Sequence, residues 1–288
     1  MKRIFRETEQ RLQAVTDCPA LEAALLIEAC LGISREKIWA GADCQVDSVQ
    51  IDRLEKMLWK RLQGYPLQYL LGEWEFYSLP FTVGEGVLIP RADTERLVDC
   101  ALQFLQNRTM PRVLDLCSGS GCIAIAIAHE HPDCTVTAVE LDEQAMEYLR
   151  TNIARHHVPV CAVQADVLKG PQNLVEIQPE YDLIISNPPY IQPEIIDGLS
   201  REVQYEPRNA LDGGPDGLMF YRALLSQWSV LLKPDGAMMV EIGYDQGETV
   251  HTLMKKHFAW TALVQDYAGN DRVVIGSQQC LQSSTFLV

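Results

Sequence analysis

The sequence is short of basic residues and contains no long apolar run. Its 288 residues include 24 Lys and Arg against 39 Asp and Glu, which gives a formal net charge of −15. Broad, nonspecific nucleic-acid binding relies on clustered cations, so this balance argues against it without excluding a local basic path. No apolar stretch is long enough to span a bilayer, and Met1–Phe5 has no apolar signal-peptide core behind it. We therefore expect no membrane association.

The cysteine pattern disfavours metal-binding and disulfide-rich classes. The nine cysteines form no CxxC pair and no zinc-ligand spacing, and an odd number without a signal peptide is typical of a reducing cytoplasm. They stand at positions 18, 30, 44, 100, 117, 122, 134, 161 and 280, mostly inside apolar segments. The composition, 47% hydrophobic and 22% charged, is that of a globular protein. We expect a cytoplasmic protein without a bound metal.

Residues 1–72 predict a small helical bundle. Apolar residues recur at helical spacing between Pro19 and Gly32, which are typical start and stop residues of a helix. A second helix ends at Gly64 and carries several Lys and Arg residues, which form either a solvated face or a docking surface for an anionic partner. So small a bundle buries little core alone, so we expect it to pack on the rest of the chain or to present something to it.

Residues 73–90 change to short, aromatic-rich extended pieces that are broken by proline and glycine. This pattern predicts a β-hairpin linker between two domains. A helix should follow, with Asp93 or Thr94 as its N-cap.

From residue 91 to 277 the chain alternates strands and helices, which predicts an α/β domain with a mostly parallel sheet covered on both faces. The last two of seven expected strands lie close together and predict an antiparallel hairpin at the sheet edge. The expected strands are 113–116, 136–140, 160–165, 181–186, 237–242, 260–267 and 272–276. Residues 278–288 read as a loose tail.

A glycine-rich loop follows the first of these strands, where open α/β sheets bind ligands. Glycines there let a ligand approach the backbone closely. The next strand ends in Glu140, a side chain able to accept both hydroxyls of a ribose, although a strand-end carboxylate is often merely exposed. Asp166 and Val167 end the third strand and could meet an adenine ring. We expect the loop to contribute Asp115, Cys117, Ser118, Gly119, Ser120 and Gly121 to a cofactor site.

Two cofactors are compatible with this loop. The segment from Gly119 to Ala124 matches G-x-G-x-x-A, so NAD must be considered. A dinucleotide normally has its first glycine directly after the strand, whereas Cys117 and Ser118 intervene here, and Asp115 would oppose a pyrophosphate. The zwitterion S-adenosylmethionine has an amino group that suits an acidic residue and carries no phosphate. The loop alone is weak evidence, but together with Glu140, Asp166 and the Asn-Pro-Pro-Tyr motif that ends the fourth strand it favours the methyl donor.

The fourth strand runs directly into Asn187-Pro188-Pro189-Tyr190. Two prolines end a strand because neither can donate to a sheet ladder, and their rings fix the direction of the carbonyls around them. The Asn187 carboxamide oxygen and the Pro188 carbonyl provide two acceptors that could hold one planar NH2 group, with the aromatic ring of Tyr190 above it. Taken alone, the two prolines favour a simpler interpretation, a strand followed by a rigid turn.

Together these motifs resemble the class I methyltransferases, and the chain is most similar to the HemK/PrmC release factor glutamine methyltransferases. The resemblance covers roughly residues 1 to 277. It is carried by Leu88 to Glu95, Tyr205-Glu206-Pro207, Glu241-Ile242-Gly243 and Asp266 to Arg272, in addition to the glycine loop and Asn187 to Tyr190. Three positions depart from the expected pattern: Cys117 replaces a frequent Gly, Glu140 a frequent Asp, and Ala92 a usual Pro. Cys117 could be a nucleophile, but we favour a small side chain that fills space.

The resemblance implies a Rossmann-like fold and transfer of a methyl group from S-adenosylmethionine to a glutamine side-chain amide. The family's substrate is the Gly-Gly-Gln motif of peptide chain release factors, which the N-terminal bundle would dock. Asn187, Pro188 and Tyr190 would be catalytic, and the same residues with Pro189 would bind the substrate; Asn187 also borders the cofactor.

Three alternatives remain. A DNA or RNA methyltransferase acting on adenine N6 or guanine N2 shares the Asn-Pro-Pro-Tyr motif. A non-catalytic binding module of the same fold and an NAD-linked oxidoreductase are the others.

Overall fold

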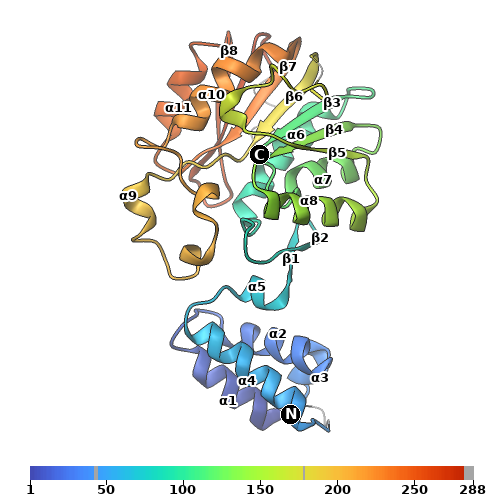
Figure 1. The fold of residues 1–288 in the computed structure, drawn as a ribbon, viewed down its shortest axis with the longest axis vertical. Coiled ribbons are helices and arrows are strands. Elements are labelled where there is room, and N and C mark those ends of the chain that lie inside the picture. The colour runs from blue at the N-terminus through green and yellow to red at the C-terminus, as the bar shows by residue number, and fades with distance from the viewer. Residues whose placement is uncertain (42–44, 178, 282–288) are drawn as a thin grey trace. The chain divides into compact units, whose positions relative to one another are not determined.

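The structure, a computed structural model, describes residues 1–41, 45–177 and 179–281. The chain divides into two units (Figure 1). The first contains Met1–Trp74 and Ser200–Tyr205, and the second contains Glu75–Leu199 and the described residues from Glu206 onward. Cys44 and positions 282–288 of the expected tail lie outside the described residues, and the boundaries at 72, 90 and 277 stay predictions.

The first unit is helical, as the sequence predicts. Its helices are α1 (Lys2–Leu12), α2 (Pro19–Leu31), α3 (Arg35–Trp39), α4 (Ser48–Leu62) and α5 (Leu67–Leu71). Pro19 occupies the first turn of α2, and Gly32 ends it in the left-handed conformation with φ of 67°. Leucine and isoleucine side chains from all five helices form a common core. Within the same unit, the buried Arg61 pairs with Glu22 at 2.6 Å and with Glu202 at 2.8 Å.

The expected hairpin is formed by β1 (Glu73–Phe76) and β2 (Leu79–Thr82), which make a two-stranded sheet. Both turn residues between the strands have positive φ, as a two-residue hairpin turn requires. The following helix begins as predicted. A 3-10 turn (Ala92–Thr94) leads into α6 (Glu95–Leu105), and Thr94 is the N-cap residue, although its side chain makes no cap hydrogen bond. The Thr94 hydroxyl accepts from Asn187 instead.

The second unit contains a seven-stranded sheet in the order β5-β4-β3-β6-β7-β9-β8. Its strands are β3 (Arg112–Leu116), β4 (Thr135–Glu140), β5 (Val160–Gln164), β6 (Tyr181–Ser186), β7 (Leu232–Glu241), β8 (Trp260–Gln265) and β9 (Asp271–Ser277). The five strands β5, β4, β3, β6 and β7 each pair in parallel with the next one in this order, whereas β9 is antiparallel to both of its neighbours. The predicted fold class, with its C-terminal antiparallel hairpin, is confirmed.

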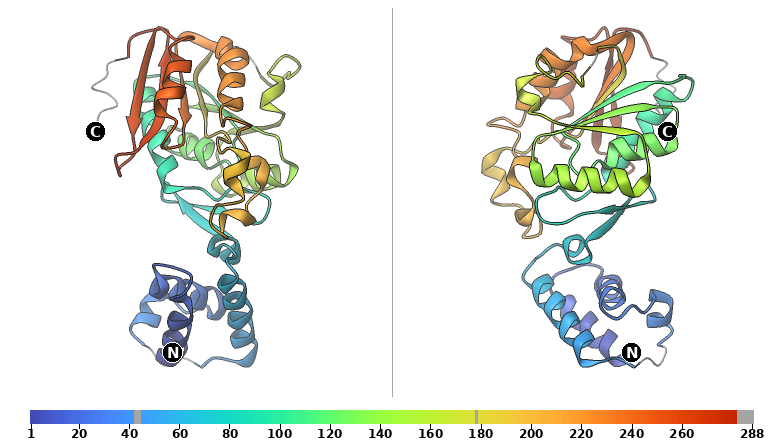
Figure 2. Two further views of the ribbon diagram at one scale, coloured as in Figure 1. Left: turned by 90° about the vertical axis from the view of Figure 1, so that its left-hand side faces the viewer. Right: turned by 45° about the vertical axis from the view of Figure 1, so that its right-hand side comes forward.

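Helices cover both faces of this sheet (Figures 1 and 2). On one face α6 packs beside α7 (Cys122–Glu130), which packs beside α8 (Glu143–His156). On the other face lie α10 (Met219–Ala223) and α11 (Gly247–Met254), and the largest core side chain there is the fully buried Trp228. After α10 the chain continues as a π-helical turn (Leu224–Trp228) and a 3-10 turn (Ser229–Leu231). Single-turn 3-10 elements and the short α9 (Pro193–Ile196) complete the connections.

Candidate active site

The strand order reverses at β3: β4 and β5 lie on one side of it in the sheet, and β6 and β7 lie on the other. Open α/β sheets bind ligands at such a switch point. Leu116 of β3 pairs with Ser186 of β6, and the Ser186 hydroxyl donates to the Leu116 carbonyl at 2.6 Å. The residues that follow these two, Cys117 and Asn187, therefore leave the sheet side by side. The two motifs singled out in the sequence meet here.

The glycine loop turns back on itself through left-handed residues. Cys117, Gly119 and Gly121 have φ of 63°, 53° and 82°. A Cβ at Gly121 would come within 2.4 Å of a Leu149 methyl group, so only glycine fits there. At Cys117 the left-handed backbone conformation is less favourable than it would be for a glycine, because the residue has a Cβ. Burial raises the pKa of its thiol well above the usual range, which keeps the sulfur protonated and argues against a nucleophilic role.

Asp115 lies beneath the loop with no exposed surface, and neither carboxyl oxygen has a hydrogen-bond partner among the described residues. The Ser118 hydroxyl donates at 3.0 Å to the backbone carbonyl of Asp115, not to its side chain. Burial raises the pKa of Asp115 to about 8, an effect that the nearby Ser118 and the Ala124 amide offset only in part. An uncompensated acidic group of this kind is suited to a cationic ligand group.

Glu140 is held at the carboxyl end of β4 by backbone donors. Its Oε2 accepts from the Gly119 N–H at 2.8 Å, and its Oε1 accepts from Leu141 and Asp142 at 2.8 and 2.9 Å. Burial raises the pKa of Glu140, and these three amides partly oppose that shift. A carboxylate has about four acceptor positions, so further donors can reach it only by using the remaining one or by sharing.

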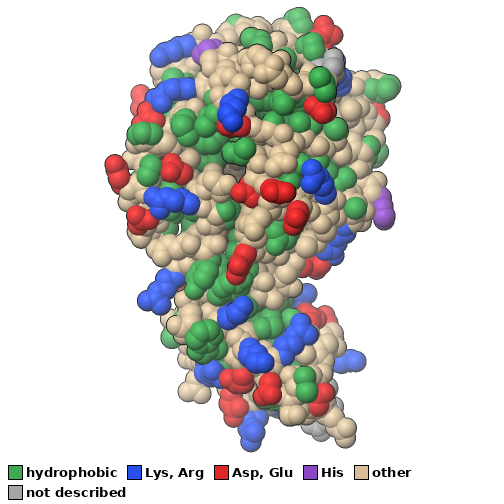
Figure 3. Space-filling model, in the orientation of Figure 1, with side chains coloured by type: hydrophobic (Ala, Val, Ile, Leu, Met, Phe, Trp, Pro, Cys, Tyr) green, Lys and Arg blue, Asp and Glu red, His purple; other side chains and the backbone are tan. Residues whose placement is uncertain are grey.

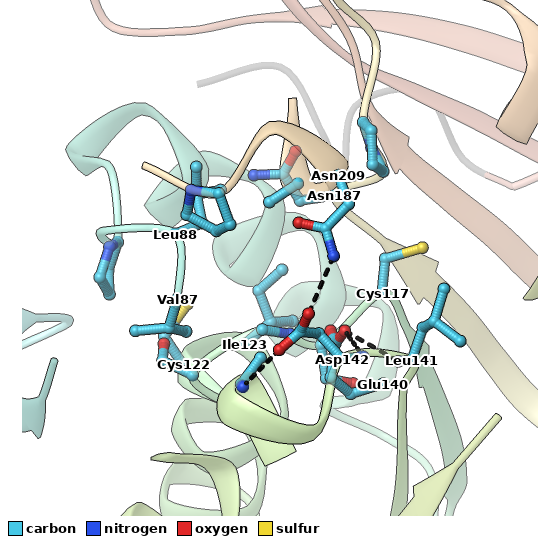
Figure 4. Close-up of a pocket in the computed structure, with 18 of the residues that line it drawn as sticks. Val87, Leu88, Cys117, Cys122, Ile123, Glu140, Leu141, Asp142, Asn187 and Asn209 are labelled. Atoms are coloured by element: carbon cyan, nitrogen blue, oxygen red, sulfur yellow. Dashed lines mark hydrogen bonds between the residues drawn. The ribbon is translucent and has the colours of Figure 1, made fainter. Parts of the chain in front are cut away.

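A single pocket joins these groups (Figure 4). Of the residues predicted for the site, Cys117, Ser118, Gly119, Ser120, Glu140, Asp166, Val167, Asn187 and Pro189 line it. Asp115, Gly121, Pro188 and Tyr190 do not. The last three are each adjacent in sequence to residues that do, whereas Asp115 lies two positions before Cys117. The Asp166 side chain accepts from Leu168 N–H at 2.9 Å, which fixes its place at the pocket wall.

The Asn187 carboxamide is oriented by a hydrogen bond in which its Nδ2 donates to Thr94 Oγ1 at 3.2 Å, while its Oδ1 has no hydrogen-bond partner among the described residues. The Tyr190 carbonyl accepts from Gln246 Nε2 at 3.1 Å. Gly213 packs against the same turn so tightly that a Cβ would lie 2.6 Å from Tyr190 Cα. Burial raises the pKa of Tyr190 to about 12, so its phenol stays neutral. The turn is thus rigidly supported.

The sequence analysis missed the opposite wall of the pocket. It is formed chiefly by Val87, Leu88, Arg91, Thr94, Asp142, Asn209 and Phe220. Asn209 Nδ2 donates to Asp142 Oδ2 at 3.0 Å across the mouth of the pocket, as Figure 4 shows. Glu206 accepts from the Ile89 N–H at 3.0 Å and pairs with Arg91. The available signal was Leu88 to Glu95 and Tyr205-Glu206-Pro207, which carry the family resemblance but which we did not assign to the site.

The described parts of the chain hold no group of three or more His, Cys, Asp and Glu side chains that could bind a metal ion. None of the helices in residues 1–41, 45–177 and 179–281 is long and apolar enough to cross a membrane.

Comparison with known proteins defines the class first. Residues 98–213 match the family model described as "Methyltransferase small domain", and residues 3–72 match the one described as "PrmC N-terminal domain". The hMettl16 catalytic domain, solved in complex with a MAT2A 3′UTR hairpin, has the same fold with a TM-score of 0.56 at 12% identity, over 92% of this chain and 82% of its own. The fold is therefore that of a methyltransferase domain.

Relatives with higher sequence identity show which methyltransferase family the chain belongs to. A release factor glutamine methyltransferase of Geobacter sulfurreducens is 38% identical, over 89% of this chain and 88% of its own length. One from Fusobacterium nucleatum is 36% identical, over 90% of this chain and 73% of its own. A solved release factor-specific protein-(glutamine-N5) methyltransferase from Alicyclobacillus acidocaldarius shares 31% identity, over 68% of this chain and 97% of its own, with a TM-score of 0.41. The chain belongs to the release factor glutamine methyltransferase family.

Proposed function

We propose that this enzyme transfers a methyl group from S-adenosylmethionine to the side-chain amide nitrogen of the glutamine in the Gly-Gly-Gln motif of a peptide chain release factor. The observation that carries the proposal is the Asn187 carboxamide at the end of β6. Its nitrogen donates a hydrogen bond to Thr94, and its oxygen has no hydrogen-bond partner among the described residues. The carboxamide lines the same pocket as the glycine loop. Family membership supplies the substrate class.

The residues present suit S-adenosylmethionine, which supplies an activated methyl group on a sulfonium when bound. Asp115 is a buried carboxyl without a partner, and it suits the amino group of the methionine moiety. Glu140 suits the ribose hydroxyls, and Asp166 with Val167 suits the adenine. The pocket wall between them is mostly apolar, and Leu88, Ile123 and Phe220 contribute to it. We propose these residues, with the loop from Cys117 to Gly121, as the cofactor site.

Catalysis must act by placement and polarisation, because the lone pair of an amide nitrogen is delocalised into its carbonyl. We assign Asn187 Oδ1 and the Pro188 carbonyl to accept the two protons of the substrate amide. These bonds would localise the lone pair and direct it at the methyl group. Tyr190, neutral and partly buried, would pack on the amide and exclude water. Orientation of this kind supplies up to roughly 7–11 kcal/mol of barrier reduction.

The N-terminal bundle (residues 1–72) would dock the release factor. Its helices would then bind the substrate as well as pack against one another. The helix α4 carries the side chains Arg53, Lys56 and Lys60, which are exposed. A translation factor as substrate would also fit a cytoplasmic location.

A nucleic-acid amino-methyltransferase is the nearest rival, because it can hold a flipped base with the same motif. Such enzymes need a basic path for the backbone. On the face that Figure 3 shows, Lys and Arg side chains alternate with Asp and Glu, and several acidic side chains gather across the larger unit. Together with the net charge of −15, this favours a protein substrate.

The test uses S-adenosylmethionine with a labelled methyl group. A release factor, its variant with the motif glutamine replaced, DNA and rRNA are offered in parallel. We expect label on the intact release factor and none on the variant or the nucleic acids. Label on nucleic acid with none on the release factor would overturn the proposal.

A further inference from the structure

Gln246 lies in the turn between β7 and α11 and is partly buried. Because β6 and β7 are neighbouring parallel strands, this turn lies at the same edge of the sheet as the turn after β6. The Gln246 Oε1 accepts from the Gly243 N–H at 3.0 Å, and its Nε2 donates to the carbonyls of Tyr190 at 3.1 Å and Gly217 at 3.3 Å. A Cβ at Gly217 would lie 2.5 Å from the same Tyr190 oxygen, so that carbonyl is closely enclosed.

These partners allow the Gln246 carboxamide one orientation. A backbone N–H only donates and a carbonyl only accepts. In the flipped amide, the NH2 group would face the Gly243 N–H and the oxygen would face two carbonyls. The Tyr221 hydroxyl supports the observed orientation, because it lies 3.3 Å from Oε1 as well as 2.9 Å from the Glu241 carbonyl.

The peptide group that follows Tyr190 is held at both of its polar atoms. Its carbonyl accepts from Gln246, and its N–H, which belongs to Ile191, donates to the Leu211 carbonyl at 2.9 Å. On the other side of Tyr190, the ring of Pro189 fixes φ of the preceding residue. The Tyr190 Cα is therefore held from both sides, and its side chain leaves the backbone in a set direction.

We propose that Gln246 is a positioning residue that holds the Tyr190 ring where it packs on the substrate amide. This inference rests on the proposed function, since that packing is the role assigned to Tyr190. Gln246 does not contact the reacting atoms in this role. It acts through the Tyr190 carbonyl, and it ties the end of β7 to the turn after β6.

The first experiment compares two Gln246 variants at saturating S-adenosylmethionine and release factor. Gln246→Met keeps the length of the side chain and removes the hydrogen bonds. Gln246→Glu keeps the shape and an acceptor for Gly243, but it sets an oxygen against the Tyr190 carbonyl. We expect kcat to fall about 10- to 100-fold in each, because a small displacement of a positioned group is enough for such a loss.

Gln227→Met is the matched control. Gln227 is also partly buried, and its Nε2 also donates to a backbone carbonyl, that of Leu168, at 3.1 Å. It does not line the pocket, so kcat should stay within about threefold of the native value. Calorimetry with S-adenosylmethionine should give a native affinity for every variant, which shows that the pocket is folded.

A double-mutant cycle with Tyr190 separates positioning from a general structural role. If Gln246 acts by placing the ring, its substitution costs little once the ring is gone. Gln246→Met combined with Tyr190→Ala should therefore be within about threefold of Tyr190→Ala alone, whereas Tyr190→Phe keeps the ring and should preserve the full effect of Gln246→Met.

The inference is wrong if either Gln246 variant retains native kcat, or if the losses of Gln246→Met and Tyr190→Ala multiply. It is also wrong if the affinity for S-adenosylmethionine falls in parallel with kcat, since that result would indicate a disturbed pocket. Failure of the native enzyme to methylate a release factor would instead refute the proposed function.

Discussion

Replacement of Asp115 by Asn should make the ligand-free protein more stable at alkaline pH while it impairs cofactor binding. The side chain is fully buried and has no hydrogen-bond partner among the described residues. Its pKa rises from 3.8 to about 8 because ionisation inside the protein is not compensated. Asn has nearly the same shape and cannot ionise, so the substitution removes this penalty.

The sign and size follow from proton linkage. The folded protein holds the Asp115 proton up to about pH 8, whereas the unfolded chain releases it near 3.8. The folded state therefore binds more protons across this window, and stability falls as the pH rises through it. A shift of about four units, at about 1.4 kcal/mol per unit, corresponds to a loss on the order of 5 kcal/mol by pH 8. Partial entry of water would reduce that figure.

The assay is urea unfolding of the native protein and Asp115→Asn at a series of pH values between about 4 and 9. The difference in free energy of unfolding should grow in favour of the variant up to about pH 8 and then level off. Other raised groups, such as Glu241, are present in both proteins and cancel. Calorimetry with S-adenosylmethionine should show an affinity that rises with pH in the native protein only. A stability difference that does not vary with pH would refute the reasoning on Asp115, and equal affinities would place the amino-group contact elsewhere.

Three further substitutions separate the roles assigned to the pocket. Asn187→Ala should lower kcat about 10²- to 10³-fold, as loss of one preorganised polar contact does, while S-adenosylmethionine still binds by calorimetry; a near-normal rate would remove the role of Asn187. Glu140→Ala should weaken S-adenosylmethionine binding about 10- to 100-fold and leave kcat at saturation nearly unchanged, and an unaltered dissociation constant would contradict the ribose contact. Cys117→Gly relieves a left-handed φ but makes the unfolded chain more flexible, so chemical denaturation should show a change within about 1 kcal/mol, with methyl transfer retained. Abolished transfer in Cys117→Gly would reveal a chemical role of the thiol.

The sequence predicted the sheet and the meeting of its two motifs well, because both depend on local patterns. Apolar strands that alternate with helices specify a parallel sheet, and the loops that follow β3 and β6 must then lie at one edge. The pairing of Leu116 with Ser186 in the structure puts Cys117 and Asn187 next to each other, as that reasoning requires.

The parts that could not be predicted depend on contacts between distant segments. Thr94 is the N-cap residue of α6 as predicted, but its hydroxyl accepts from Asn187, 93 positions away, and makes no cap hydrogen bond. Asn209 reaches Asp142, 67 positions away, to border the pocket. The interruption of α10 by a π-helical turn likewise accompanies tertiary packing, in which the Trp228 indole donates to the Val167 carbonyl at 2.9 Å. Propensity and spacing carry no information on such pairs.

The central claim is that Asn187 and Pro188 hold the amide of a glutamine side chain for methylation. The most direct measurement is tandem mass spectrometry of a release factor after incubation with the enzyme and S-adenosylmethionine. We expect one added methyl group on the side-chain nitrogen of the Gly-Gly-Gln glutamine, formed about 10²- to 10³-fold more slowly when Asn187→Ala replaces the native enzyme. A methyl group on any other residue, or on that glutamine at an equal rate with Asn187→Ala, would contradict it.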